Sequence, residues 1–240
     1  SPEEVAMINY TSGTTGFSKG VMIPYRALWG NLDFAQDVLG PHLKPGKSIV
    51  SILPMAHMYG MAFEFIKEFM TGCHIFYLSR IPSPAIVAQA FAEIKPIIII
   101  AVPLVIEKII KGKVLPTLEK PAMKVLCAIP GLNKILYNVV REKVMSAFGG
   151  NCEEIILGGA AISEPIEKVL KKPYTVGYGM TECGPLVGYE HHENFKFGSC
   201  GKCVYCAEIR VDNPDPVTGV GELQVRGDNV MIGYYKNQEP

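Results

Sequence analysis

The sequence has 240 residues, in which 23 Lys and Arg balance 23 Asp and Glu, so the formal net charge is zero. This balance excludes a protein that attracts nucleic acid through a bulk basic field, and an apolar fraction of 48% excludes intrinsic disorder. At this length the chain can bury a substantial core, as one large domain or as parts of two. The 24 glycines and 18 prolines exceed average usage, and they gather in short loops between apolar segments.

The sequence carries no sign of secretion or of a membrane span. The first residues show no basic segment followed by an apolar one. The longest apolar run, 97–106, contains Pro103 and is too short to cross a bilayer. The seven cysteines are an odd number without a small disulfide framework. We therefore expect free thiols and a cytoplasmic protein.

Strand-like and helix-like segments alternate along most of the chain. Prolines stand at or just before expected helix starts, at Pro24 and Pro103, and glycines at expected helix ends, at Gly40 and Gly72. This alternation predicts the α/β class, a mainly parallel sheet covered by helices on both faces. In chain order we expect strands at 5–10 and 21–23, a helix at 25–39, a strand at 48–53, a helix at 60–71, a strand at 73–78, a helix at 83–94, a strand at 97–102, helices at 103–111 and 133–148, a strand at 153–157, a helix at 164–171 and a strand at 174–176.

The pattern changes after about Phe195, where the segments become short. Strands with alternating apolar and polar residues are expected at 207–211 and 221–226, with turn residues between them. We therefore divide the chain into an α/β part, residues 1–195, and the start of a small antiparallel, barrel-like subdomain, residues 196–240.

A polar, glycine-rich loop lies between the first two expected strands, from Thr11 to Gly20. Glycine lets backbone N–H groups turn toward an anion, hydroxyl groups donate to phosphate oxygens, and a lysine offsets their charge. The loop is not the P-loop of nucleotide hydrolases, because a strand follows it where that motif leads into a helix. On composition alone, a plain hairpin stays open as the alternative. The residues that suit phosphate are Thr11, Ser12, Gly13, Thr14, Thr15, Gly16 and Lys19.

Three further segments carry motifs that accompany this loop. Segment 177–182 places Tyr178 between two glycines, where its ring can lie flat against a base. The segment ends in Glu182, a hard oxygen donor that suits Mg²⁺. Together with 157–162 and 221–237, in the same order along the chain, these segments resemble the signatures of the adenylate-forming superfamily, which includes acyl-CoA synthetases, luciferases and the adenylation domains of nonribosomal peptide synthetases.

The resemblance implies roles for individual residues. Thr181 would contact the α-phosphate, and Glu182 together with Thr11 would hold the magnesium ion. Lys19, Thr181 and Glu182 are therefore the expected catalytic residues. His57 stands where the family borders its acyl pocket, so it is either a pocket residue or a packing histidine. The expected nucleotide-binding residues outside the loop are Gly158, Gly159, Ala160, Ala161, Gly177, Tyr178, Gly179, Met180 and Thr181.

The three cysteines Cys200, Cys203 and Cys206, in the spacing Cys-x2-Cys-x2-Cys, invite a hypothesis about a metal. A closed zinc site needs four ligands, and an iron–sulfur run would place a cysteine where Arg210 stands. The resemblance supplies no metal here, so metal binding is the less favoured interpretation of Cys200, Cys203 and Cys206. We expect a loop surface for the adjacent pair His191 and His192.

Segments 177–189 and 198–202 most resemble long-chain fatty acyl-CoA synthetases, particularly bacterial ones. The implied reaction joins a fatty carboxylate to ATP as an acyl-adenylate and then transfers the acyl group to coenzyme A. The implied cofactors are ATP or AMP, Mg²⁺ and coenzyme A, with no nucleic acid as partner. Peripheral membrane association and a homo-oligomer of the parent enzyme stay open. Two alternatives also stay open: an adenylating enzyme with another acceptor, such as a peptide synthetase or a carrier-protein ligase, and a non-catalytic nucleotide-binding module.

The family's pattern is incomplete in this sequence. Members carry a long segment before the phosphate loop. After the barrel they have a Thr-Gly-Asp motif, a hinge and a small mobile domain with a catalytic lysine, and none of these occurs here. We therefore expect a core piece of an AMP-binding domain, with nucleotide and acyl binding in residues 1–195. Alone, this piece is expected to bind ATP weakly if at all and to form no thioester.

Overall fold

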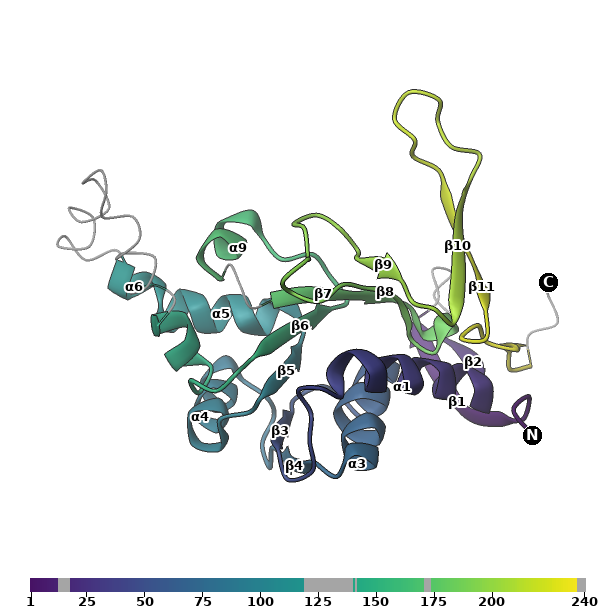
Figure 1. The fold of residues 1–240 in the computed structure, drawn as a ribbon. Coiled ribbons are helices and arrows are strands. Elements are labelled where there is room, and N and C mark those ends of the chain that lie inside the picture. Colours follow the sequence, from purple (N-terminus) through teal and green to yellow (C-terminus); the bar gives the residue numbers. More distant parts are fainter. Residues whose placement is uncertain (13–17, 119–139, 141, 171–173, 237–240) are drawn as a thin grey trace.

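The computed structural model describes residues 1–12, 18–118, 140, 142–170 and 174–236. Within these ranges strands and helices alternate, and the predicted α/β class is confirmed (Figure 1). Parallel strands form the middle of the molecule, and antiparallel strands come from the segments near both chain ends.

The middle of the molecule contains seven strands, β3 (Ser48–Ser51), β4 (His74–Tyr77), β5 (Ile98–Ala101), β6 (Glu154–Gly158), β7 (Tyr174–Gly179), β8 (Leu186–Tyr189) and β9 (Lys202–Cys203). Five of them form one sheet in the order β5-β6-β7-β8-β9, while β3 and β4 form a separate parallel pair. In the larger sheet β5, β6 and β7 are parallel, and β8 and β9 add antiparallel. All residues of β5 and β6 are buried, as expected for parallel strands covered on both faces.

The helices of the described chain are α1 (Tyr25–Leu39), α2 (Met58–Gly60), α3 (Lys67–Thr71), α4 (Pro84–Ile94), α5 (Pro103–Lys113), α6 (Leu115–Leu118) and α9 (Glu164–Leu170). Alternate residues of β5 enter different cores. Ile99 packs in the core that includes α4 and α5, whereas Ile98 and Ile100 pack in the core that includes α1 and α2. The two-residue period of a strand therefore divides the interior into two apolar layers. No helix in the described ranges has the length and apolar character needed to cross a membrane.

The N-terminal sheet consists of β1 (Val5–Ser12), β2 (Ser18–Pro24) and β12 (Gly233–Tyr234). β1 and β2 are antiparallel, with Thr11 opposite Lys19 and Ser12 opposite Ser18. Both strands therefore extend farther into the predicted loop than expected, and only residues 13–17 of that loop lie outside the described residues. Because β12 pairs with β2, a segment from the C-terminal part of the chain returns to the N-terminal hairpin.

The structure confirms some predicted helix boundaries and revises others. The helix predicted at 25–39 coincides with α1, and Gly72 ends α3 in the left-handed region at φ 77°. The helix predicted at 60–71 begins earlier, at Met58, and passes through a π-helical segment, Met61–Ile66. That segment displaces the helical register by one residue relative to an ordinary α-helix.

The C-terminal strands occupy three places. β10 (Ala207–Asp212) and β11 (Glu222–Gly227) form the expected antiparallel hairpin, which projects from the rest of the molecule in Figure 1. By contrast, β9 belongs to the central sheet and β12 to the N-terminal sheet. The division of the chain at residue 195 stays a prediction.

Three short strands are not predicted from the sequence, and one predicted helix is described only in part. The sequence analysis does not predict β8, β9 or β12, which have four, two and two residues. The two-residue strands β9 and β12 are too short for pattern recognition. Of the helix predicted at 133–148, residues 142–147 are helical, and most of the remainder lies outside the described residues.

Candidate active site at the carboxyl ends of the parallel strands

Two neighbouring cavities lie where β6 and β7 end. The smaller has a volume of about 190 Å³ and the larger of about 330 Å³, and both are lined by Gly159, Gly177 and Gly179. In open α/β sheets ligands bind beyond the carboxyl ends of the strands. Of the sequence-predicted residues, the smaller cavity is lined by His57, Gly158, Gly159, Gly177, Gly179, Met180 and Thr181, and the larger adds Ala160, Ala161 and Tyr178.

Two of these glycines have no room for a side chain. A Cβ on Gly158 would approach the ring of Tyr59 to 2.6 Å, and a Cβ on Gly179 would collide with the carbonyl oxygen of Pro185. Glycine at these positions therefore lets the ring and the backbone pack closely against the strand ends. The close packing forms part of the lining of the smaller cavity.

Tyr59 is a cavity residue that the sequence does not single out. Its ring lines the smaller cavity, and its hydroxyl donates to the carbonyl oxygen of Ile156 at 3.3 Å. Burial raises the pKa of Tyr59 far above its usual range, with the nearby Glu64 and Glu154 carboxylates adding to the effect. The phenol is therefore a neutral donor that fixes the ring beside Gly158. Its one sequence signal is its place two residues after His57.

A short 3-10 turn, Thr181–Cys183, follows β7 and carries two predicted catalytic residues. Asn31 of α1 is fully buried and holds the C-terminal end of this turn and the start of β8. Its side-chain amide donates to the carbonyl of Cys183 at 3.1 Å, and its carbonyl accepts from the backbone N–H of Leu186 at 2.8 Å. Asn31 is therefore a positioning residue for Thr181 and Glu182, and its importance depends on a contact between residues far apart in sequence.

Lys19 and Glu182 both contact Tyr234, a residue to which the sequence alone assigns no role. The Lys19 ammonium lies 4.9 Å from the centroid of the Tyr234 ring, and the Tyr234 hydroxyl donates to Oε1 of Glu182 at 3.1 Å. Desolvation, followed by the hydrogen bond to Glu182, raises the pKa of Tyr234. A cation over an aromatic face is attracted to it, so Tyr234 links the phosphate loop to the turn. The signal for Tyr234 is the Gly-Tyr-Tyr segment in which it stands.

The oxygen donors predicted for a magnesium ion are on adjacent elements. Thr11 pairs with Lys19 across the β1–β2 hairpin, and residues opposite each other in such a pair project from the same face. Lys19 in turn lies over Tyr234, which binds Glu182. A threonine hydroxyl and a carboxylate are oxygen donors of the kind that Mg²⁺ prefers, so the residues present fit this ion. Gly13, Thr14, Thr15 and Gly16 lie outside the described residues.

A buried carboxylate supports the rim of the smaller cavity. Glu64, in the π-helical segment, accepts hydrogen bonds from the Ser51 hydroxyl at 3.0 Å and from the backbone N–H groups of Ile52 and Leu53 at 3.1 and 2.8 Å. Burial raises the pKa of Glu64 to about 7, although these hydrogen bonds act in the opposite direction. Leu53 and the exposed His57 both line the cavity, so Glu64 fixes the start of the segment that bears His57.

The histidine pair agrees with its prediction only in part. The side chains of His191 and His192 are 26% and 15% exposed, and both lie beside the buried carboxylate of Glu154. The pair lies in a loop, as predicted, but its rings are only partly exposed because both lie against Glu154. In the part of the chain that the structure describes, this is the one group of three or more His, Cys, Asp or Glu residues whose ligand atoms all lie within 4.8 Å. No such group is formed by Cys200, Cys203 and Cys206.

Known proteins share both the sequence pattern and the fold. A family model described as AMP-binding enzyme matches residues 1–235. Long-chain-fatty-acid–CoA ligase 4 of Saccharomyces cerevisiae is 28% identical over 259 residues, and the long-chain-fatty-acid–CoA ligase of Escherichia coli is 27% identical over 250 residues. Both alignments cover 99% of this chain, but only 37% and 39% of the relatives. The chain thus spans less than two-fifths of their length.

Solved structures with low sequence identity have the same fold. The o-succinylbenzoate CoA synthetase of Bacillus subtilis, in complex with its acyl-adenylate intermediate, has a TM-score of 0.73 at 22% identity, over 99% of this chain and 43% of that one. A malonyl-CoA ligase with methylmalonyl-CoA and AMP bound has a TM-score of 0.72 at 24% identity, over 100% of this chain and 47% of that one.

Proposed function

Since the chain belongs to the family of AMP-binding enzymes, we propose that the protein containing it is an ATP-dependent long-chain fatty acid–CoA ligase. A fatty carboxylate oxygen attacks the α-phosphorus of ATP, and the bond to the β-phosphate breaks to release pyrophosphate. The coenzyme A thiolate then attacks the acyl carbonyl, and AMP leaves with the electron pair of the broken C–O bond. The similarity to long-chain ligases at 27–28% identity supports the choice of substrate.

One observation carries the proposal. Three segments that the sequence associates with nucleotide or acyl binding line two adjoining cavities at one edge of the sheet, although they come from distant parts of the chain. They are the loop with His57, the end of β6 and the segment from Gly177 to Thr181. Their convergence supports a single site for both reactants.

The two cavities suit different parts of the reactants. Tyr178 lines the larger cavity, where its ring would stack on the adenine beside Ala160 and Ala161. The smaller cavity is mostly apolar, with Met58, Leu186 and Val102 in its wall, which suits an acyl chain. The two cavities share Gly159, Gly177 and Gly179 in their linings, so the carboxylate and the α-phosphate would meet beside these glycines, within reach of Thr181 in the smaller cavity.

Charge stabilisation in the adenylation step falls to residues on β1, on β2 and in the Thr181–Cys183 turn. The Lys19 ammonium would offset charge on the leaving pyrophosphate, and the Thr181 hydroxyl would donate to an α-phosphate oxygen. The Thr11 hydroxyl and the Glu182 carboxylate would hold the magnesium ion. Magnesium, when bound, neutralises phosphate charge and stabilises the developing pyrophosphate.

Pyrophosphate exchange into ATP by the full-length protein tests the proposal. We expect exchange that requires a fatty acid and is stronger with a long-chain acid than with acetate, followed by thioester formation when coenzyme A is added. Exchange that depends on an amino acid, or transfer to a carrier protein in place of coenzyme A, would overturn the choice of substrate or acceptor. We further infer that the 240-residue chain alone forms no thioester, and the same assay on that chain checks this.

A further inference from the structure

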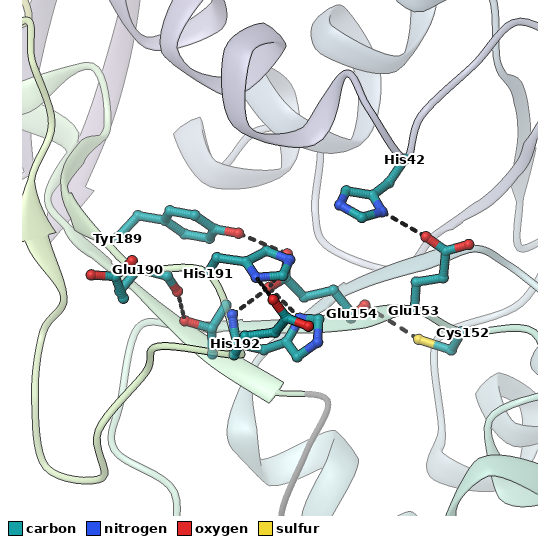
Figure 2. Close-up of polar contacts among 10 residues, drawn as sticks. His42, Cys152, Glu153, Glu154, Tyr189, Glu190, His191 and His192 are labelled. Atoms are coloured by element: carbon teal, nitrogen blue, oxygen red, sulfur yellow. Dashed lines mark hydrogen bonds and ion pairs between the residues drawn. The ribbon is translucent and has the colours of Figure 1, made fainter.

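A second cluster of functional side chains lies at the opposite end of the central sheet. Glu154 is the first residue of β6, and His191 and His192 come shortly after β8. Figure 2 shows both rings beside the Glu154 carboxylate. None of the three residues lines either cavity, so the cluster is separate from the candidate active site.

The Glu154 carboxylate is buried and oriented. Its side chain is 3% exposed. Oε2 accepts a hydrogen bond from the Tyr189 hydroxyl at 2.7 Å, and Oε1 accepts from the backbone N–H of His192 at 2.9 Å. Within the described residues, its ion-pair partners are His191 and His192. A buried carboxylate needs a compensating positive charge, and these two histidines are the groups in place to supply or to bind it.

One nitrogen in the cluster lacks a hydrogen-bond partner. Nε2 of His191 is buried and without a partner in the described part of the chain, and it lies 3.9 Å from Oε1 of Glu154. That separation is too long for a hydrogen bond. The ring cannot swing away freely, because it stacks on His42 with centroids 5.6 Å apart, and His42 is held by Glu153 at 2.7 Å. A buried, fixed and unpartnered nitrogen beside a carboxylate points to a missing ligand.

We propose that Glu154, His191 and His192 bind a divalent transition metal, with zinc as the ion that suits them best. Two imidazoles and one carboxylate form a zinc donor set that leaves a fourth position for water. With zinc–ligand distances of about 2.0–2.2 Å, ligand atoms in a tetrahedron are about 3.3–3.6 Å apart. Oε1 of Glu154 lies 3.0 Å from Nδ1 of His192 and 3.9 Å from Nε2 of His191, so small shifts give this spacing.

Tyr189 completes the arrangement from outside the donor set. Its hydroxyl holds Oε2 of Glu154 and leaves Oε1 directed at the two histidines. Such outer hydrogen bonds orient metal ligands and raise metal affinity. The metal would connect the start of β6 to the segment after β8, across the intervening strand β7. It would thereby brace the strands whose other ends form the candidate active site.

The test is zinc titration of the chelator-treated 240-residue chain by calorimetry, with circular dichroism to establish that each variant is folded. We expect one zinc ion per chain. At about 100-fold excess over the dissociation constant, zinc should raise the melting temperature by roughly 5–10 °C. Y189F should weaken binding by roughly 10–100-fold, and H191Q should weaken it more because it removes a ligand. H74Q, at an exposed position on β4, should bind as the unaltered chain does.

The absorption spectrum of bound Co²⁺ distinguishes this site from a site formed by cysteine thiolates. We expect a Co²⁺ spectrum without a thiolate charge-transfer band, and its loss in H191Q. Three results would overturn the proposal. The first is no zinc binding at neutral pH, which would leave a shared proton as the link between Glu154 and the histidines. The others are unchanged zinc binding by folded H191Q, and a thiolate band that disappears in C203S, which would move the site to the cysteines.

Discussion

The two ends of strand β6 differ in how their residues are assembled. The carboxyl end is rich in glycine, and its residues come in short contiguous segments such as Gly177 to Thr181. The amino end gathers buried titratable side chains, and Glu154 meets His192 from 38 residues away. The first kind of site leaves a pattern in the sequence because close backbone approach requires glycine at fixed spacings. The second leaves none, because any loop that passes the carboxylate can supply the histidines.

Since we place nucleotide chemistry at the carboxyl end alone, the largest effect on activity is expected from substitution of Lys19. In the full-length protein, K19M removes the ammonium that would offset pyrophosphate charge. We expect its rate of pyrophosphate exchange to fall by about 10²–10³-fold, as for loss of one transition-state donor.

The matched control for K19M is K236M. Lys236 lies 5.2 Å from the ring of Tyr235, in a pairing like that of Lys19 with Tyr234, but it is exposed and follows the last described strand. Equal losses in the two variants would show that the cation–aromatic contact, and not the position beside the phosphates, accounts for the effect.

Asn31 tests whether the turn at Thr181 depends on α1. N31A leaves the carbonyl of Cys183 and the N–H of Leu186 without their buried partner. Each orphaned group costs about 1–3 kcal/mol, so we expect a marked fall in the free energy of unfolding, measured by urea denaturation. N151A, at an exposed position, should change it little, and a small effect of N31A would show that the turn is held by other contacts.

Gly158 tests the claim that close approach defines the carboxyl end. G158A places a methyl group against the Tyr59 ring, and overpacking of this kind costs about 1–3 kcal/mol. G112A is the control, because Gly112 lies in α5 with nothing within 4 Å of an added Cβ, and there alanine should stabilise by about 0.5–1 kcal/mol. Equal effects at the two positions in thermal denaturation would contradict the packing argument.

The buried carboxylate at the carboxyl end predicts a pH effect. The pKa of Glu64 is raised from 4.5 to about 7 by burial. Between these values the folded protein holds a proton that the unfolded chain has released, so stability falls as the pH rises through this window. The slope from one group is at most about 1.4 kcal/mol per pH unit. E64Q cannot ionise, and we expect its unfolding free energy to fall less steeply with pH than that of the unaltered chain. Parallel pH profiles would contradict the assignment.

The sequence predicts best what depends on local pattern. The bounds of α1 follow from Pro24 and Gly40, and the buried strand β5 follows from its apolar run. The segments around Gly158 and Tyr178 are identified by their glycines, and the structure brings them to one pair of cavities. In each case neighbouring residues determine the outcome.

What the sequence does not predict depends on long-range contact. β12 is a strand only because β2 lies beside it, and Tyr234 matters only because Lys19 and Glu182 flank it. From the sequence, Asn31 is an ordinary polar residue on a helix, and its role depends on its contact with the Thr181–Cys183 turn. The roles of the predicted site residues themselves stay predictions for experiment.

Hydrogen–deuterium exchange on the full-length protein tests the central claim most directly, since it reports on both ends of β6 at once. With AMP and Mg²⁺ we predict slower exchange in peptides that cover 158–162 and 177–182, and no change in the peptide that covers 189–192. Unchanged exchange at 177–182, or protection confined to 189–192, would contradict the placement of the nucleotide at the carboxyl end of the sheet.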